Sequence, residues 1–389
     1  MTQLVYGHDE VFERFRRAVA QGRLASTFLF VGPAGIGKRL FAERLTAALL
    51  CESNAPNQLD QCGHCESCKL LEAGNHPDFV TIERNQGAAT LSIDQFIGAP
   101  DKRGREGLCH DISLKAMRGG RKIGIIDDAD YLIREAANCL LKTLEEPPPR
   151  SVLILIGTSL QRQISTIRSR CQIVRFQPLP DETVAQILLE KNLVQSPEQA
   201  AEWATRSAGS VAQAILNADE NLLEFRQWFL EILSKGELLA APLATEINKF
   251  IKASGGGSDD DDGDSGEPSA ASARKTTAKK KAPKQDATEV PKVKLTTRDR
   301  VRFVVNIAIE FHHELLLKLT GTTTACHDQL MQRAVARRAG NWSSSIDQVL
   351  AVLNRCLVAR KQVDSNANMA TLLEAWLDDT QQLEWQRGG

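Results

Sequence analysis

Residues 32–39 read GPAGIGKR and directly follow the short apolar run TFLFV at 27–31. The stretch matches the pattern G-x-x-x-x-G-K-[ST] except at its last position. In that pattern, backbone N–H groups surround phosphates, the Lys reaches the outer phosphates, and the final hydroxyl binds Mg²⁺. The last position here is Arg39, whose guanidinium offers donors and no lone pair for a metal. The loop residues expected to contact a nucleotide are Gly32, Gly35, Gly37 and Lys38. The sequence therefore predicts a phosphate-binding loop that lacks one protein ligand for Mg²⁺.

Apolar runs alternate with helical patterns over the first half of the chain. Strands are expected at 27–31, 122–126, 152–156 and 172–176, and helices at 40–49 and 131–145. Strands that read as continuous apolar runs and alternate with helices are typical of a parallel sheet covered on both faces. Such sheets bind ligands at the carboxyl ends of their strands, where the glycine-rich loop lies. The expected fold class is an α/β P-loop domain.

Polar side chains follow two of these strands. Asp127 and Asp128 come directly after KIGII, and Thr158 follows VLILIG. An acid at the first position holds Mg²⁺ in P-loop enzymes, directly or through water, and a neighbouring acid can position the attacking water. A hydroxyl at the second position could sense the outer phosphate. The alternatives are that Asp128 or Asp130 caps the next helix and that Thr158 is a turn residue.

Four of the nine cysteines are crowded into 51–68, with the spacing C-x₁₀-C-x₂-C-x₂-C. They are Cys51, Cys62, Cys65 and Cys68. Zn²⁺ takes four thiolates in a tetrahedron, and each C-x₂-C pair places two sulfurs on one side of it. The pattern favours a structural Zn²⁺ with no open position for water. The alternatives are a set of buried free thiols, or a site in which His64 replaces one cysteine.

Composition limits the class of protein. The 389 residues are 42% hydrophobic and carry a formal net charge of −1, which gives two or three packed domains and no chain-wide attraction to nucleic acid. No run approaches the length of a membrane-spanning helix, and the N-terminus has no apolar signal region. We expect a cytoplasmic chain with no membrane partner, in which crowded cysteines indicate a metal rather than disulfides.

The second half reads as helical with one interruption. A compact group of three helices is expected at 181–217, amphipathic helix at 221–252, and further helix from 296 to about 384. Residues 253–294 are rich in Gly, Ser, Ala, Pro and charge, with four consecutive Asp before a basic block. Such a composition predicts disorder. The tract is either a solvated insertion or a basic arm that touches DNA phosphates, with its acidic half as a competitor.

Specific motifs resemble the bacterial DNA polymerase III clamp loader family of AAA+ proteins. They are LLKTLEEPP at 140–148, SRC at 169–171, GNHPDFVTIE at 74–83 after the cysteines, and LVARKQVDSNANMATLLEAWL near the C-terminus. The resemblance implies an AAA+ domain at 1–178 with a zinc module at 51–68, a helical lid at 179–218, and an all-α collar at 219–389 interrupted at 253–294. It also implies an open ring with the gamma/tau and delta subunits that loads a sliding clamp onto primed DNA.

The same resemblance assigns a role to Arg170 of the SRC motif, which would reach a neighbour's γ-phosphate as a trans arginine finger. Active family members carry Ser or Thr at the position of Arg39 and an Arg in the lid motif G-S-x-R-D-A, which here reads GSVAQA with Ala212 at that position. Two departures in one pocket suggest weak or absent ATPase activity, with ATP and Mg²⁺ binding doubtful. The alternatives are a gamma/tau-like ATPase motor and a zinc-dependent nucleic-acid-binding module.

Residues 102–122 form a locally basic stretch. Its basic residues are Lys102, Arg103, Arg105, Lys115, Arg118, Arg121 and Lys122. They could face DNA or a neighbouring subunit, or form an ordinary solvated surface.

Overall fold

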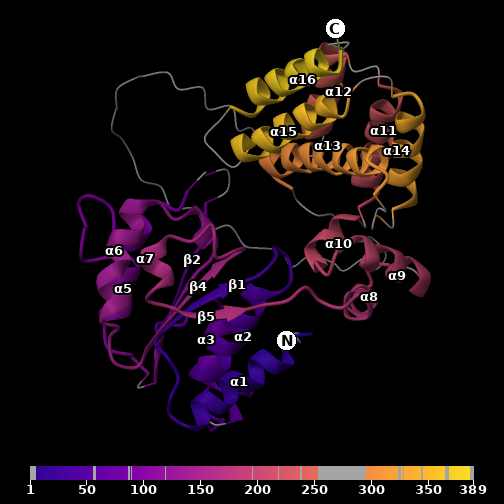
Figure 1. Ribbon diagram of the computed structural model, residues 1–389. Helices are drawn as coiled ribbons and strands as arrows, with labels where there is room; N and C mark the ends of the chain where they lie inside the picture. The colour runs from indigo at the N-terminus through magenta and orange to yellow at the C-terminus, as the bar shows by residue number, and fades with distance from the viewer. Residues whose placement is uncertain are drawn as a thin grey trace, which may run out of the picture.

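The computed structural model describes residues 6–385, apart from 56–57, 86–87, 89, 119, 195, 218, 237–238, 253–294, 323–325, 327, 343–344 and 364–367. The tract predicted to be disordered at 253–294 therefore lies outside the described residues. Figure 1 shows a sheet-containing N-terminal part, a small group of helices α8 to α10, and a larger C-terminal helical part.

Five parallel strands form one sheet in the order β2-β3-β4-β1-β5. They are β1 (Thr27–Val31), β2 (Phe79–Ile82), β3 (Lys122–Ile126), β4 (Ser151–Gly157) and β5 (Gln172–Arg175). The four strands expected from the sequence are present. Every residue of the three central strands is buried, as continuous apolar runs require, whereas the edge strands β2 and β5 are partly exposed. The short edge strand β2 was not expected, because the sequence analysis used its residues only as part of the motif GNHPDFVTIE.

Alternate residues of each strand serve two cores, one on each face of the sheet. On one face, α1 (Asp9–Ala20) and α2 (Lys38–Leu50) pack around a cluster of phenylalanines. Phe41 of α2 contacts Phe30 of β1 at 5.8 Å and Phe176 at 5.0 Å between ring centroids. These contacts fix the helix that follows the glycine-rich loop, and so they fix the loop.

The other face is covered by shorter helices and one long one. They are α4 (Asp94–Ile97), α5 (Leu108–Ser113), α6 (Arg134–Glu145) and α7 (Ser165–Arg168). Their core includes Leu140 and Leu144 of α6, packed with Leu153 and Leu155 of β4. Helix α3 (Glu66–Glu72) follows the cysteine-rich segment, beside α2.

Three helices follow the sheet, at the positions expected for them. They are α8 (Asp181–Glu190), α9 (Pro197–Arg206) and α10 (Val211–Asn217). They enclose a small core of their own, which includes Leu188 and Trp203.

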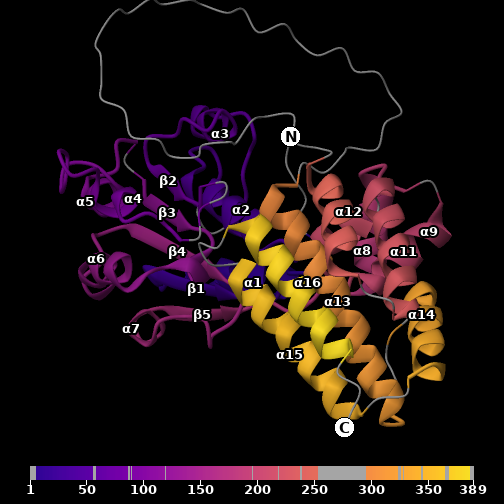
Figure 2. The same ribbon diagram turned by 90° about the horizontal axis from the view of Figure 1, so that it is seen from above.

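The C-terminal part is entirely helical within the described residues. Its helices are α11 (Glu220–Lys235), α12 (Ala240–Lys252), α13 (Thr297–Leu319), α14 (Gln329–Gly340), α15 (Ile346–Val363) and α16 (Met369–Trp385). Helix α13 begins at a capping box of Thr296 and Asp299 and contributes Phe303, Val304 and Phe311 to the core. Figure 2 shows α13, α15 and α16 side by side. Among the described helices, none is both long and apolar enough to cross a bilayer.

A buried ion network joins the small helical group to the C-terminal helices. Asp328, which caps α14, accepts from Arg206 of α9 at 2.6 Å and from Arg226 of α11 at 2.9 Å. Arg226 also pairs with Glu310 of α13 at 3.1 Å. Burial raises the pKa of Asp328, but the two arginines outweigh it and hold that pKa below its usual value. The Asp328 carboxylate thus links α14 and α11 to the small helical group, and Glu310 joins α13 to the same network through Arg226.

We expect Asp328→Ala to lower the free energy of unfolding by about 3–5 kcal/mol, because two largely buried guanidiniums lose their one buried carboxylate partner and α14 loses its cap. The matched control is Asp379→Ala, which breaks the half-exposed pair of Asp379 with Arg355 and is expected to cost less than about 1 kcal/mol. Urea denaturation of both variants measures the difference. Equal losses would show that the Asp328 network contributes no more than a surface pair.

Candidate functional site

Sheet order brings the expected phosphate-binding residues together. Strand β4 lies between β1 and β3, so the loop after β1, Thr158 after β4 and Asp127 after β3 meet at one edge. A cavity of about 800 Å³ opens there, closed on its other side by residues of α8 and α10. The predicted residues that line it are Gly35, Gly37, Lys38, Arg39, Asp127, Asp128 and Thr158. Gly32 is not among the lining residues.

The loop has the backbone form that its glycines allow. Gly35 and Gly37 have φ angles of +76° and +92°, a region that favours glycine. Lys38 is buried, and its Nζ donates to the carbonyl oxygens of Gly32 at 2.7 Å and Pro33 at 2.5 Å. Burial lowers the pKa of Lys38, while the nearby carboxylates led by Asp127 oppose that shift. The ammonium thus lies against its own loop.

Arg39 is surrounded by carboxylates. Its Nε donates to Glu43 at 3.0 Å, and its Nη1 donates to Asp127 at 3.1 Å and to Glu83. Glu43 lies one helical turn along α2, whereas Glu83 directly follows β2. Asp127, the residue predicted to hold a metal, is therefore paired with the residue that replaces the metal-binding hydroxyl. Neither glutamate was expected from the sequence.

The two neighbouring polar residues also have partners within the protein. Asp128, at a φ of +55°, pairs with Arg84 at 3.3 Å, and burial raises its pKa despite that arginine. Its side chain makes no capping hydrogen bond, so the capping alternative is wrong for Asp128. The alternative is also wrong for Asp130, because α6 has Ile133 at its N-cap and no side-chain cap.

Thr158 is held by Asp130, whose Oδ2 accepts from its backbone N at 2.8 Å and from its Oγ1 at 2.5 Å. Gln163 also donates to Asp130. The sequence suggested Asp130 as a helix cap, and its contact with Thr158 was missed. The run DDAD at 127–130 offered the signal, since its third acid, four residues past the end of β3, lies close to the end of the next strand.

The start of α10 rests on the glycine-rich loop. Ser210 Oγ donates to Ala34 O at 2.9 Å, and Ala212 N donates to Gly35 O at 3.3 Å. A Cβ on Gly35 would lie 2.4 Å from Ser210 Oγ and 2.6 Å from the Cβ of Ala212. The residue at the lid position is therefore a small side chain packed against the loop, with no guanidinium to reach a phosphate.

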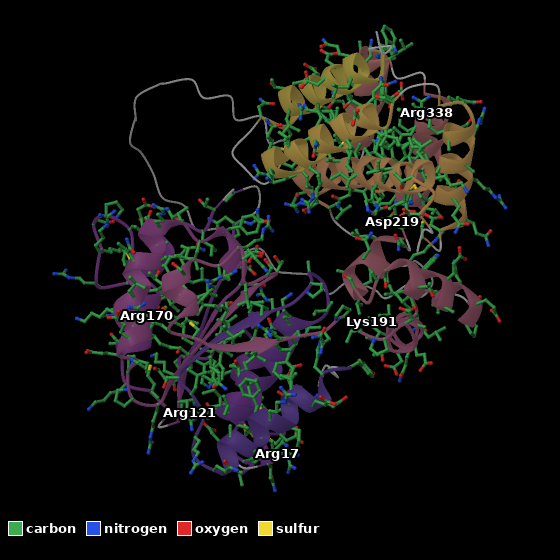
Figure 3. The ribbon with its side chains drawn as sticks, viewed as in Figure 1. Arg17, Arg121, Arg170, Lys191, Asp219 and Arg338 are labelled. Carbon is green, nitrogen blue, oxygen red and sulfur yellow. The ribbon has the colours of Figure 1, made fainter. Side chains whose placement is uncertain are left out.

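Arg170 lies at the other edge of the sheet. It precedes β5, which runs parallel to β1, and its carbonyl accepts from Thr27 Oγ1 at 2.8 Å at the start of β1. The glycine-rich loop follows the other end of β1, about 15 Å away for a five-residue strand. Arg170 does not line the cavity, and Figure 3 shows it on the far side of the sheet from the lining residue Lys191.

The Arg170 guanidinium is held at the surface by the LLKTLEEPP motif. Its Nε donates to Glu145 at 2.8 Å, and its Nη1 donates to the Thr166 carbonyl at 3.1 Å and to Ser169 Oγ at 3.2 Å. Its side chain is 31% exposed. Glu145 comes from the end of α6, so two motifs that are 25 residues apart meet at one point.

The four cysteines of 51–68 gather at one point. Their sulfurs all lie within 4.8 Å of one another, and Cys62 and Cys68 are 4.0 Å apart. Four thiolates at about 2.3 Å from a Zn²⁺ would lie about 3.8 Å from each other, so the arrangement fits a tetrahedral ion. His64 is not part of the group, since its Nδ1 lies 2.9 Å from the Cys62 carbonyl oxygen.

Hydrogen bonds anchor the cysteine-rich segment to the rest of the domain. Ser67 Oγ donates to Leu50 O at 2.6 Å and lies 2.8 Å from His76 Nε2. His76 Nδ1 in turn accepts from the backbone N of Asp78 at 3.0 Å. This assigns the proton of His76 to Nε2, which donates to Ser67. Both side chains are buried, so the pair positions Cys68 rather than acting on a substrate.

Part of the basic stretch at 102–122 is used within the chain. Arg118 pairs with Glu52 at 2.5 Å and with Glu66 at 3.0 Å, both beside the cysteines. Lys122 is buried 3.7 Å from Asp78. Arg103 and Arg105 are exposed. The sequence pattern indicated one basic surface. In the structure, Arg118 and Lys122 form ion pairs within the chain, whereas Arg103 and Arg105 face solvent.

Comparison with known proteins finds a family that the N-terminal part of this chain resembles. Residues 7–180 match the family model described as "DNA polymerase III, delta subunit". The DNA polymerase III subunit delta′ of Pseudomonas aeruginosa is 35% identical over 228 residues, which are 58% of this chain and 66% of that protein. The Escherichia coli subunit delta′ is 32% identical over 204 residues, 52% of this chain and 58% of that protein. The N-terminal part of the chain is similar to the delta-prime subunits of DNA polymerase III. The matches span between 58% and 66% of these two relatives.

The resemblance extends more weakly to another subunit of the same assembly. Escherichia coli DNA polymerase III subunit tau is 29% identical over 220 residues, 56% of this chain and 32% of that protein. A solved gamma subunit-related protein from Thermotoga maritima is 13% identical and covers 96% of this chain and 99% of its own, but its TM-score of 0.34 is too low to bear on the fold.

We expect Gly35→Ala to destabilise the protein more than Gly37→Ala. Both glycines have positive φ, so both variants carry a backbone cost of about 1–2 kcal/mol. A Cβ on Gly37 meets nothing within 4 Å, whereas one on Gly35 overlaps Ser210 and Ala212. The added overlap is expected to cost a further 1–3 kcal/mol or so in urea denaturation and to raise amide exchange in α10. Equal losses in the two variants would argue against the contact between α10 and the loop.

Proposed function

We propose that the chain is a delta-prime subunit of a bacterial DNA polymerase III clamp loader ring and supplies Arg170 to ATP bound by a neighbouring subunit. In this proposal, residues 1–178 form the AAA+ domain, 179–218 the lid, and 219–389 the collar that joins the ring. The gamma/tau and delta subunits are its direct partners, and the sliding clamp and primed DNA are partners of the assembled complex. The position of Arg170 at the sheet edge opposite the chain's own cavity is the observation that carries the proposal.

A guanidinium suits this task because it stabilises charge that spreads over phosphoryl oxygens during transfer. The partner of Arg170 within the chain is Glu145, which is half-exposed. A surface pair of this kind contributes little to stability, so a neighbour's phosphate can replace it at small cost. The contacts with Thr166 and Ser169 would still hold the guanidinium in place during that exchange.

The chain's own pocket is proposed to hydrolyse ATP weakly or not at all. Arg39 replaces the hydroxyl that binds the metal, and Ala212 replaces the lid arginine. Lys38 and the glycine-rich loop remain, and the cavity of about 800 Å³ is large enough for a nucleotide. The gamma/tau-like motor role requires both missing groups, so the same two positions argue against it.

The cysteine cluster is proposed to hold a structural Zn²⁺. Cys51, Cys62, Cys65 and Cys68 would supply all four ligands, which leaves no position for a substrate. The ion would tie the end of α2 to the start of α3, and its contribution would be to stability.

The finger assignment predicts that Arg170→Ala lowers clamp-stimulated hydrolysis at the neighbouring subunit's ATP site about 10³-fold or more, in a reconstituted loader whose other ATP sites are inactivated and whose ring assembly is intact. Arg168→Ala is the matched control, since Arg168 lies two residues away and its guanidinium donates to the Leu160 carbonyl instead of to Glu145. Size-exclusion chromatography checks assembly, and steady-state turnover checks catalysis. Normal turnover of an assembled Arg170→Ala loader would exclude the trans role.

The zinc assignment predicts one Zn²⁺ per chain in the wild type and its loss in Cys65→Ser, measured by elemental analysis of the purified protein. His64→Ala is expected to keep the metal, because its ring faces a backbone carbonyl. Cys109→Ser, outside the cluster, is the second control. Loss of zinc from His64→Ala with retention in Cys65→Ser would reverse the ligand assignment.

A further inference from the structure

Arg39 has three carboxylates as hydrogen-bond acceptors at the edge of the cavity. They come from three separate elements, namely Glu43 on α2, Glu83 after β2, and Asp127 after β3. Burial opposes the charge on Arg39, but the bonds from Glu43 and Glu83 outweigh it and raise its pKa. The arginine is therefore a permanent cation held by a ring of acids.

The acids at the strand ends have their oxygens committed to the protein. The Oδ2 of Asp127 accepts from Arg39 at 3.1 Å, and its Oδ1 accepts from the backbone N of Asp128 at 2.9 Å. Asp128 pairs with Arg84, and Asp130 accepts from Thr158. Mg²⁺ needs oxygen ligands in a near-octahedral shell at about 2.0–2.1 Å, and a guanidinium beside the central carboxylate repels a divalent ion. The residues present therefore do not fit the Mg²⁺ that the family's fold implies.

We propose that Arg39 is the resident cation of this pocket, so that its guanidinium takes the position and the charge-neutralising role of a divalent metal and excludes the metal from Asp127. The acids around Arg39 then form a cation site that the Arg39 guanidinium occupies in place of a metal ion. The prediction follows that removing the guanidinium, while restoring a hydroxyl, opens a divalent-cation site made by Asp127, Glu83 and the new hydroxyl.

This inference extends the proposed lack of ATP hydrolysis in the chain's own pocket. It concerns metal binding and can be tested without nucleotide or turnover. Arg39 could exclude Mg²⁺ from Asp127 even if Arg170 has no role at a neighbour's ATP. Conversely, a chain that binds Mg²⁺ at Asp127 could still supply Arg170 to a neighbour. The two proposals can therefore fail separately.

The experiment compares thermal unfolding of the zinc-loaded wild type and Arg39→Thr, each in MgCl₂ and in NaCl of equal ionic strength. The wild type is expected to show the same Tm in both salts. Arg39→Thr is expected to unfold at lower temperature in NaCl, because Glu43, Glu83 and Asp127 then repel one another without a cation. Mg²⁺ is expected to raise its Tm by about 2–4 °C or more over NaCl.

Two further variants locate the effect. In Arg39→Thr combined with Asp127→Asn, the specific Mg²⁺ effect should disappear, since the central ligand is lost. Arg39→Lys should behave as the wild type does, because it keeps a cation at this position.

The proposal is overturned if Mg²⁺ stabilises the wild type in a way that Asp127→Asn abolishes, or if folded Arg39→Thr gains nothing from Mg²⁺ over NaCl. Should Arg39→Thr fail to fold in both salts, Arg39→Lys decides: indifference to Mg²⁺ supports the proposal, and an Asp127-dependent Mg²⁺ effect refutes it.

Discussion

Burial of β1, β3 and β4 on both faces is the constraint on which the rest of the molecule depends. A strand that is covered on both sides must be apolar between its two ends, so polar chemistry is confined to the strand ends. Because all five strands are parallel, their carboxyl ends meet at one edge and their amino ends at the other. The glycine-rich loop, Asp127 and Thr158 share the first edge, whereas Arg170 lies at the second. The separation between the chain's own pocket and Arg170, the residue proposed to act on a neighbour, thus follows from strand direction.

The sequence predicted the central sheet well because continuous apolar runs leave few alternatives. It missed β2, an edge strand of four residues, which is too short a run to stand out from the motif that contains it. The cysteine cluster and the lining of the pocket were also predictable, since their spacing and their positions after strands are local features. The partners of those residues were not. Glu83 lies 44 residues from Arg39 in the sequence, and Asp328 lies 122 residues from Arg206. Contacts between residues so far apart in the sequence depend on how the helices and strands pack.

The lid-like helices are attached on two sides. Ser210 and Ala212 bond to the glycine-rich loop, and Arg206 pairs with the buried Asp328 beside α14. A lid that opens and closes with nucleotide would have to break contacts at one of these sides in each cycle. The loop contacts are two neutral hydrogen bonds with a close backbone approach, whereas the Asp328 contact is a buried ion pair. Any movement of the lid would therefore begin at the loop, with the lid staying attached to the C-terminal helices.

The substitutions at Arg39 and Ala212 become coherent when they are considered together. In active ATPases of the family that the sequence resembles, the pocket is expected to change state through a metal and a lid arginine, both of which respond to the outer phosphate. In this chain a side chain of fixed charge holds Asp127, and a methyl group packs against the loop, so both responsive groups are replaced by permanent contacts. Each replacement stabilises one arrangement of the loop, the strand ends and the lid without any ligand. Arg170 is carried by the same rigid sheet and depends on neither position. Under the proposed function, such a chain can hold Arg170 in one orientation whatever its own pocket contains.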